Sequence, residues 1–281
     1  MPSVAATVAA AAARLCADGF APDDADRDAA VIARGVLGWS LADWLSRRHE
    51  DSQPAFIATF DAFVTRRATG EPVAYLLGTR EFYGRDFIVE PGVLVPRPET
   101  ELLIDTALAW VRTTGAHAVA DVGTGTGCVA VTLTLEHPSL SILATDCSAD
   151  ALAIARRNAA ALGASSIEWR LTDLLDGVQG PVDLVVSNPP YVPERDRESL
   201  QPDVRDFEPA LALFGGPDGL DVVRRLIPSA HARLIPGGAL MMEVGIDQSP
   251  SVTHLLEAAG FSDITWHPDL QHILRVVAAR K

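Results

Sequence analysis

From Glu99 to the end of the chain, short apolar segments alternate with segments of helical periodicity. The apolar runs are "AVADVGTG", "SILATD", "VDLVVSN" and "GALMMEVG", and helical stretches such as "SADALAIARRNAAALG" separate them. A strand that helices cover on both faces is apolar throughout, and two parallel strands need a long crossover between them. The alternation therefore predicts an α/β domain over residues 99–281, a mainly parallel sheet with helices on both faces.

The first 70 residues show the spacing of short amphipathic helices instead. In "DDADRDAAVIARGVLGW" apolar residues recur at helical intervals after an acidic first turn, and Ser40 is a good N-cap for "SLADWLSRR". Residues 1–70 are therefore predicted to form a small helical domain. Residues 71–98 are predicted to be a β-hairpin around Gly84-Arg85, followed by an extended linker that prolines punctuate.

The charge of the chain bears on its partners. Its formal net charge is −14 and its pI about 4.8. Proteins that hold nucleic acid through its phosphates need a basic face. An acidic chain suits a small molecule, or a neutral or basic protein partner, rather than direct contact with nucleic acid.

Several patterns bear on location and metal content. The start, "MPSVAATVAAAAARLCADGF", lacks the basic segment of a signal peptide and is better interpreted as an alanine-rich helix. No stretch reaches the roughly 18 uncharged apolar residues that span a membrane. The three cysteines form no CxxC pair and the seven histidines have no ligand spacing. We therefore predict a cytoplasmic protein without a metal site.

The glycine-rich segment "DVGTGTG", Asp121 to Gly127, follows the first predicted strand of this domain. In open α/β sheets ligands bind beyond the carboxyl ends of the strands, and glycines let the backbone approach a ligand closely. A dinucleotide fingerprint would need a third glycine at position 128, which is Cys128. The GxGxG spacing favours S-adenosylmethionine over NAD, with a plain strand-to-helix turn as the alternative.

Two acidic residues follow the next two strands. Asp146 lies some twenty residues beyond the glycines, where a carboxylate can accept hydrogen bonds from ribose hydroxyls. The alternative is helix capping, but Ser148 can supply the cap and leave Asp146 free. Asp173, in "RLTDLL", is placed to reach the amino group of an adenine, although an aspartate in a polar loop is common.

The fourth strand ends in Asn188-Pro189-Pro190-Tyr191. Proline cannot continue a central strand, so the strand stops in a stiff turn. The Asn188 side chain offers an acceptor oxygen, and the prolines hold the Pro189 carbonyl in a fixed direction. Two converging acceptors suit an NH₂ group, and Tyr191 offers a flat wall for a planar amide or base.

"NPPY" and "DVGTGTG" together resemble the class I S-adenosylmethionine-dependent methyltransferases that act on planar nitrogen. The segment "GEPVAYLLGTREFYGRDFIVEPGVLVPRPETE", with "PRPETE" as its most specific part, is similar to the signature of the HemK/PrmC family. The resemblance extends over nearly the whole chain. It implies a protein-(glutamine-N5) methyltransferase that modifies the GGQ glutamine of peptide chain release factors and forms S-adenosyl-L-homocysteine. It also implies an N-terminal helical substrate-recognition domain, a hairpin linker and a Rossmann-like seven-stranded sheet with an antiparallel last strand.

The resemblance also implies roles for individual residues. Asn188 and Pro189 would hold the substrate amide, with Tyr191 packed on the glutamine and Pro190 stiffening the turn. Arg97, Glu99 and Thr100 would line the mouth of the site, although a linker salt bridge explains Arg97 as well. The cofactor would be held by the glycine-rich turn, the two acids, an aliphatic neighbour of the adenine and the turn asparagine: Gly123, Thr124, Gly125, Thr126, Gly127, Asp146, Asp173, Leu174 and Asn188.

Three positions depart from the family pattern. Leu174 and Leu175 stand where an aromatic residue is common, Phe207 where a histidine is common, and Gln271-His272 where a glycine is usual. Three other functions remain open: an adenine-N6 nucleic-acid methyltransferase, a ribosomal-protein glutamine methyltransferase, and a module of this fold that only binds. The first acts on the same kind of NH₂ group. We expect the protein to be a monomer.

Overall fold

The computed structural model describes all 281 residues, which form two compact units. The helical unit contains Met1–Thr79 and also Gln201–Phe207, and the α/β unit contains Arg80–Leu200 and Glu208–Lys281. Residues 201–207 follow the "NPPY" turn in sequence, so their place in the helical unit was not anticipated.

The helical unit has a small apolar core of its own. Leu15, Ile32 and Phe60 are completely or almost completely buried there. Ser40 begins a helix through a capping box with Asp43, as its sequence predicts. The predicted alanine-rich first helix is present. The helices are α1 (Val4–Ala17), α2 (Pro22–Leu37), α3 (Leu41–Arg47), α4 (Pro54–Ala68), α5 (Val73–Leu77) and α9 (Pro202–Phe207).

The residues after Gly70 differ in part from the prediction. Val73–Leu77 form helix α5 and not the start of a hairpin linker, and Gly78 ends this helix at a φ of 72°. A five-residue helix is shorter than the window in which helical periodicity can be recognised. The predicted hairpin follows as β1 (Thr79–Phe82) and β2 (Arg85–Ile88), joined by a two-residue turn.

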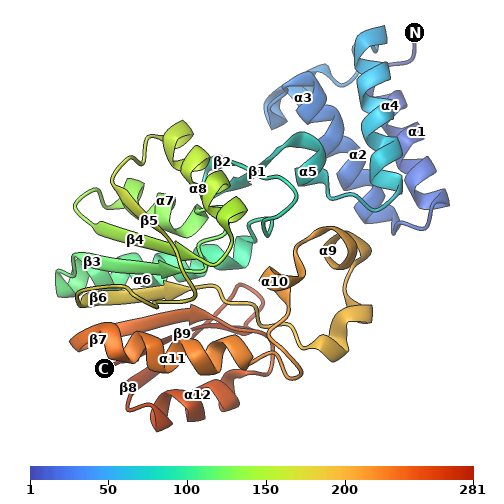
Figure 1. Cartoon of the computed structure of the whole chain (residues 1–281). Coiled ribbons are helices and arrows are strands. Elements are labelled where there is room, and N and C mark those ends of the chain that lie inside the picture. The colour runs from blue at the N-terminus through green and yellow to red at the C-terminus, as the bar shows by residue number, and fades with distance from the viewer. The chain divides into compact units, whose positions relative to one another are not determined.

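The α/β unit contains the predicted seven-stranded sheet (Figure 1). The strand order is β5-β4-β3-β6-β7-β9-β8, in which β9 alone runs in the direction opposite to the other six strands. This is the order of a class I methyltransferase fold. The strands are β3 (Ala118–Val122), β4 (Ser141–Asp146), β5 (Ile167–Leu171), β6 (Val182–Ser187), β7 (Leu234–Glu243), β8 (Ser262–Pro268) and β9 (Leu274–Arg280).

Helices cover both faces of this sheet (Figure 1). Neighbouring residues of β6 point in opposite directions: Leu184 and Val186 pack with α6 and α7, whereas Val185 packs with α11 and α12. Burial on both sides explains why the strand reads as an unbroken apolar run. The helices are α6 (Glu101–Thr114), α7 (Cys128–Glu136), α8 (Ala149–Leu162), α10 (Ala210–Leu213), α11 (Asp221–Arg233) and α12 (Ser249–Ala258), with 3₁₀ turns η1 (Pro98–Thr100) and η2 (Glu194–Ser199).

The direction of strand addition reverses between β3 and β6. The chain proceeds from β3 outward through β4 and β5, and then returns to place β6 on the other side of β3. Val122 lies opposite Thr145 of β4 and Ser187 of β6, so these strands end level with one another. Such a switch point leaves a crevice at the carboxyl ends of the strands, which is where open sheets of this kind bind ligands.

Candidate functional site

The glycine-rich turn lies at the carboxyl end of β3. Gly123 and Gly125 have φ of 73° and 56°, and an ideal Cβ at either position would meet no atom within 4 Å. Their positive φ, not crowding within the chain, is therefore what selects glycine. At Gly127 crowding adds to the strain, because a Cβ there would approach the Cβ of Ala155 to 3.0 Å. The turn leaves its backbone open toward the crevice.

Asp121, near the end of β3, holds this turn through hydrogen bonds. Its Oδ2 accepts hydrogen bonds from Thr124 Oγ1 at 2.6 Å and from the backbone N–H of Ala130 at 3.2 Å. Burial raises the pKa of this carboxyl to about 7. The sequence predicts no role for Asp121, although an acidic residue at the end of an apolar strand is a signal that could have indicated one.

Asp146 connects β4 with the glycine turn. Its Oδ2 accepts from the backbone N–H of Gly125 and its Oδ1 from that of Ser148, both at 2.9 Å. Burial raises the pKa of Asp146. Ser148 caps α8 by accepting from Ala151 N, so the helix cap falls to serine as predicted. Asp146 faces the cavity while it holds the turn in place.

The residues after β5 form the next part of the crevice. Asp173 forms an ion pair with Arg225 of α11, and each side chain is about half exposed. The Asp173 carboxylate, predicted to reach an adenine, therefore already has a cationic partner. Leu174 adopts a φ of 51°, which is uncommon for a residue other than glycine, and lines the cavity.

The "NPPY" turn connects to two residues from other elements. Asn188 Nδ2 donates to Thr100 Oγ1 at 3.0 Å, and Thr100 Oγ1 donates to Glu243 Oε2 at 2.7 Å. The Tyr191 hydroxyl donates to Glu243 Oε1 at 3.0 Å. Burial raises the pKa of both Glu243 and Tyr191. One buried carboxylate thus links both ends of the turn to the start of α6.

The segment before α6 is tied to the loop after the turn. Glu208, whose side chain is 2% exposed, accepts from Arg97 Nη2 at 2.5 Å and from the Val95 backbone N–H at 3.1 Å. The salt-bridge alternative for Arg97 is therefore present in the structure. Neither Glu208 nor its effect on Arg97 was identified from the sequence.

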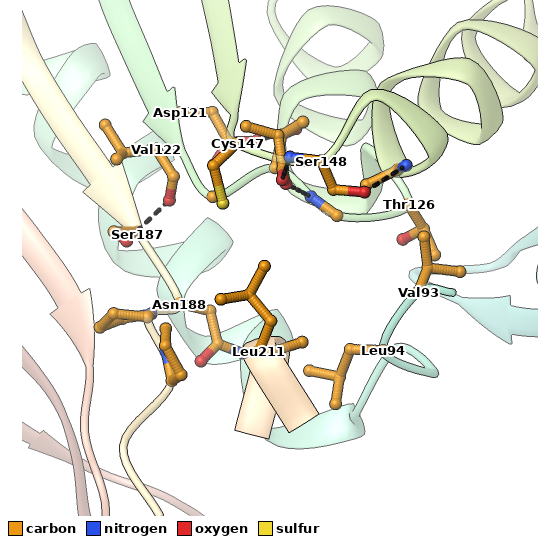
Figure 2. Close-up of a pocket in the computed structure, with 18 of the residues that line it drawn as sticks. Val93, Leu94, Asp121, Val122, Thr126, Cys147, Ser148, Ser187, Asn188 and Leu211 are labelled. Carbon is orange, nitrogen blue, oxygen red and sulfur yellow. Dashed lines mark hydrogen bonds between the residues drawn. The ribbon is translucent and has the colours of Figure 1, made fainter. Parts of the chain in front are cut away.

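These elements enclose a cavity of about 230 Å³ (Figure 2). Asp121, Cys147 and Ser148 lie on one side of it, and Asn188 and Leu211 lie on the other. Three predicted site residues, Gly127, Glu99 and Tyr191, do not line this cavity. The others do: Gly123, Thr124, Gly125, Thr126, Asp146, Asp173, Leu174, Asn188, Pro189, Pro190, Arg97 and Thr100.

The position of Tyr191 differs from the flat wall that the sequence suggested. Its hydroxyl points to Glu243, and its backbone oxygen accepts from Gln248 Nε2 at 2.9 Å. Tyr191 thus points away from the cavity, and its hydroxyl is connected to Asn188 through Glu243 and Thr100. Sequence alone could not show this, because the direction of the ring depends on β7, which lies far along the chain.

Two further findings describe the whole chain. No group of three or more histidine, cysteine, aspartate or glutamate side chains is arranged to hold a metal ion. None of the helices combines the length and apolar character needed to cross a membrane.

Comparison with family models gives two matches. The model described as methyltransferase small domain matches residues 98–202, and the model described as PrmC N-terminal domain matches residues 7–78. The second match falls on the helical unit, and the first spans the glycine turn and the "NPPY" turn.

Curated proteins similar over nearly their full length include two named release factor glutamine methyltransferase. One, from Cereibacter sphaeroides, is 44% identical, and the match covers 96% of each chain. The other, from Xylella fastidiosa, is 42% identical, and the match covers 100% of this chain and 98% of the relative.

Solved structures share the fold at low identity. The hMettl16 catalytic domain in complex with an RNA hairpin aligns with a TM-score of 0.57 at 17% identity, covering 77% of this chain and 81% of that one. A T. thermophilus 16S rRNA N2 G1207 methyltransferase in complex with AdoMet and guanosine aligns with a TM-score of 0.52 at 20% identity, covering 72% and 49%.

Proposed function

This chain belongs to the release factor glutamine methyltransferase family, and on that premise we propose that it methylates N5 of the glutamine in the GGQ motif of peptide chain release factors. The methyl donor is S-adenosylmethionine, and S-adenosyl-L-homocysteine is the second product. The observation that supports this most directly is that Asn188 and the glycine turn line the same cavity. A donor and an amide can therefore meet there.

The residues at the switch point suit such a cofactor. The backbone at Gly123 and Gly125 is open, Asp146 presents a carboxylate beside it, and Leu174 adds an aliphatic surface. We assign the methionine and ribose parts to the turn residues Gly123 to Thr126 with Asp146, and the adenine to Leu174. When bound, S-adenosylmethionine supplies a methyl group on a positively charged sulfur.

The chain's own contribution is to orient the acceptor. A primary amide is a poor nucleophile, because its nitrogen lone pair is delocalised into the carbonyl. We propose that Asn188 Oδ1 and the Pro189 carbonyl each accept one N–H of the glutamine amide, which aims the nitrogen at the donor. Positioning and preorganised dipoles supply most of the acceleration. As the nitrogen takes the methyl group from sulfur it becomes strongly acidic, so it loses its proton to solvent afterwards and no strong base is needed. Apolar residues at the mouth, such as Leu94 and Leu211, help to exclude water.

We propose modified roles for three predicted substrate residues. Tyr191 supports the turn from behind, through Glu243. Arg97 lines the cavity while paired with Glu208, so its guanidinium shapes the mouth and is not a free cation. Glu99 lies outside the cavity, and we assign it to the outer edge, where a bound release factor would pass.

We further propose that the helical unit recognises the release factor away from its GGQ tip, because a glutamine flanked by glycines offers little specificity alone. The net charge of −14 favours a protein partner over direct contact with nucleic acid. We propose a monomer that acts in the cytoplasm, where release factors work.

One assay separates this function from its rivals. The protein is incubated with methyl-labelled S-adenosylmethionine in three separate reactions, which contain a release factor, a ribosomal protein or adenine-containing DNA. Label on the GGQ glutamine, located by tandem mass spectrometry, is the expected result. A release factor in which asparagine replaces this glutamine should stay unlabelled. Transfer to adenine or only to ribosomal protein would overturn the proposal, and no transfer at all would favour a binding module.

Replacing Asp146 with alanine is expected to weaken binding of S-adenosylhomocysteine by about 10- to 100-fold. The variant removes a charged acceptor for ribose hydroxyls, and hydrogen bonds to charged groups contribute about 1.5–3 kcal/mol. It also releases the Gly125 and Ser148 N–H groups. Isothermal titration calorimetry measures the dissociation constant. Asp150→Ala, an exposed carboxylate four residues later, is the matched control and should bind like the wild type. Equal affinity of Asp146→Ala and wild type would remove Asp146 from the cofactor site.

A further inference from the structure

The segment "PRPETE", the most specific part of the family signature, places one threonine in an unusual position. Thr100 ends the 3₁₀ turn η1 at the start of α6, and only 2% of its surface is exposed. It nevertheless lines the cavity, where its hydroxyl lies between Asn188 and Glu243. These partners are 88 and 143 residues away along the chain. The threonine therefore joins the ends of β6 and β7 across the site.

The hydrogen bonds that connect Asn188, Thr100 and Glu243 have a defined direction. Glu243 is buried, and its two oxygens accept from the hydroxyls of Thr100 and Tyr191. A hydroxyl has one hydrogen, and that of Thr100 is directed to Glu243. Thr100 Oγ1 can then only accept a hydrogen bond from Asn188, so the NH₂ group of Asn188 is the donor.

This direction decides what Asn188 shows to the cavity. A carboxamide has nearly the same shape in its two flipped orientations, but its oxygen accepts and its nitrogen donates. With Nδ2 held by Thr100, Oδ1 is the end left to face an incoming group, and it accepts no hydrogen bond within the chain. The flipped orientation would set an NH₂ group against the substrate NH₂, and two donors would then face each other.

We propose that Thr100 and Glu243 are positioning residues that fix the acceptor end of the Asn188 carboxamide toward the substrate amide, an inference that rests on the proposed function. Glu243 sets the direction of the Thr100 hydroxyl, and Thr100 sets the orientation of Asn188. Polarisation along these connected hydrogen bonds makes Oδ1 a stronger acceptor, since such bonds reinforce one another. Glu243 also fixes Tyr191, so one carboxylate holds both ends of the "NPPY" turn.

The test is a double-mutant cycle on turnover. Thr100→Val keeps the shape of the side chain and removes its hydroxyl, and it should lower kcat about tenfold, the effect of losing one hydrogen bond. In an Asn188→Ala background the same change should alter kcat by less than about twofold, because the residue that it positions is gone. Thr100→Ser restores the hydroxyl and should return kcat to within about threefold of the wild type.

Two matched measurements separate positioning from a purely structural role. Thr106→Val removes a hydroxyl from helix α6, which follows Thr100; this hydroxyl donates only to the Leu102 backbone carbonyl, so the change should leave kcat unchanged. Hydrogen exchange of the Asn188 side-chain NH₂, followed by NMR without substrate, should accelerate at least about tenfold in Thr100→Val and recover in Thr100→Ser. Binding of S-adenosylhomocysteine should stay within about threefold of the wild type in all variants.

The outcomes are distinguishable. A wild-type kcat in Thr100→Val would overturn the inference. So would a tenfold loss that persists in the Asn188→Ala background, because the threonine would then act by another route. If the wild type transfers no methyl group to a release factor, the proposed function fails and this inference fails with it. The exchange measurement would in that case still report the hydrogen bond alone.

Discussion

An enzyme with Asn188→Ala is expected to turn over at least about 100-fold more slowly than the wild type, the usual effect of removing one preorganised polar group from an active site. The variant deletes the acceptor that we assign to the substrate amide. Its NH₂ partner, Thr100, keeps its own bond to Glu243, so the surroundings stay hydrogen bonded. Single-turnover and steady-state rates with a release factor measure the effect.

Binding distinguishes this loss from a general disruption. Asn188→Ala should bind S-adenosylhomocysteine within about threefold of the wild type, since Asp146 and the glycine turn, which also line the cavity, remain. Gln179→Ala removes an exposed carboxamide that lies outside the cavity and serves as the control for turnover. Unchanged turnover in Asn188→Ala would mean that the amide is not held as we describe.

Replacing Arg67 with methionine is expected to lower the free energy of unfolding of the helical unit by about 3–5 kcal/mol, the cost of removing one partner of a buried ion pair. Arg67 Nε donates to Asp28 Oδ2 at 2.7 Å, and its Nη1 donates to the carbonyls of Gly70 and Glu71 at 3.1 Å. Asp28 is only 7% exposed. Without Arg67, this carboxylate keeps only the exposed Arg27, whose Nε lies 3.9 Å from Asp28 Oδ1, and it has little access to water.

The same arginine secures α9. Its Nη2 donates to Asp203 Oδ2 at 3.2 Å, so the segment that follows the "NPPY" loop depends on it. Hydrogen exchange read by mass spectrometry should therefore show faster exchange in α9 as well as in α2 and α4. Chemical denaturation followed by circular dichroism measures the stability.

An exposed pair in the same unit is the control. Arg14 and Asp61 are joined at 2.7 Å but have side chains 40% and 64% exposed, and Arg14→Met should cost less than about 1 kcal/mol. A double variant that replaces both Arg67 and Asp28 with apolar residues should recover most of the stability, because no buried charge is then left alone. Similar losses at Arg67 and Arg14 would contradict this account.

The features that could be predicted from the sequence are those that local chemistry determines. The strands appear where apolar runs are long enough to be buried on both faces, and Ser40 and Ser148 cap their helices as predicted. The glycine turn and the "NPPY" turn stand at strand ends because glycine and proline restrict the backbone directly. Helix α5 was missed because five residues leave no periodicity to detect.

The sequence predicted which backbone turns form the site better than it predicted which side chains contact one another there. Asn188 and Asp146 line the cavity, as expected. Asp173 and Arg97 also line the cavity. Each forms an ion pair with a side chain that the sequence did not indicate as its partner, Arg225 for Asp173 and Glu208 for Arg97. The partner of a charged side chain depends on which strands become neighbours, and no pattern within a short window contains that information.

By itself the sequence determined the sheet, the helical unit's first helices, the place of the two turns at the switch point and the family. These follow from periodicity and from backbone restrictions, both of which act over a few residues. Only the tertiary structure decided how the Asn188 amide is turned, that Tyr191 faces Glu243, and that residues 201–207 join the helical unit. Hydrogen-bond direction and burial depend on groups that meet only when distant segments pack together, and for that reason they are properties of the folded chain.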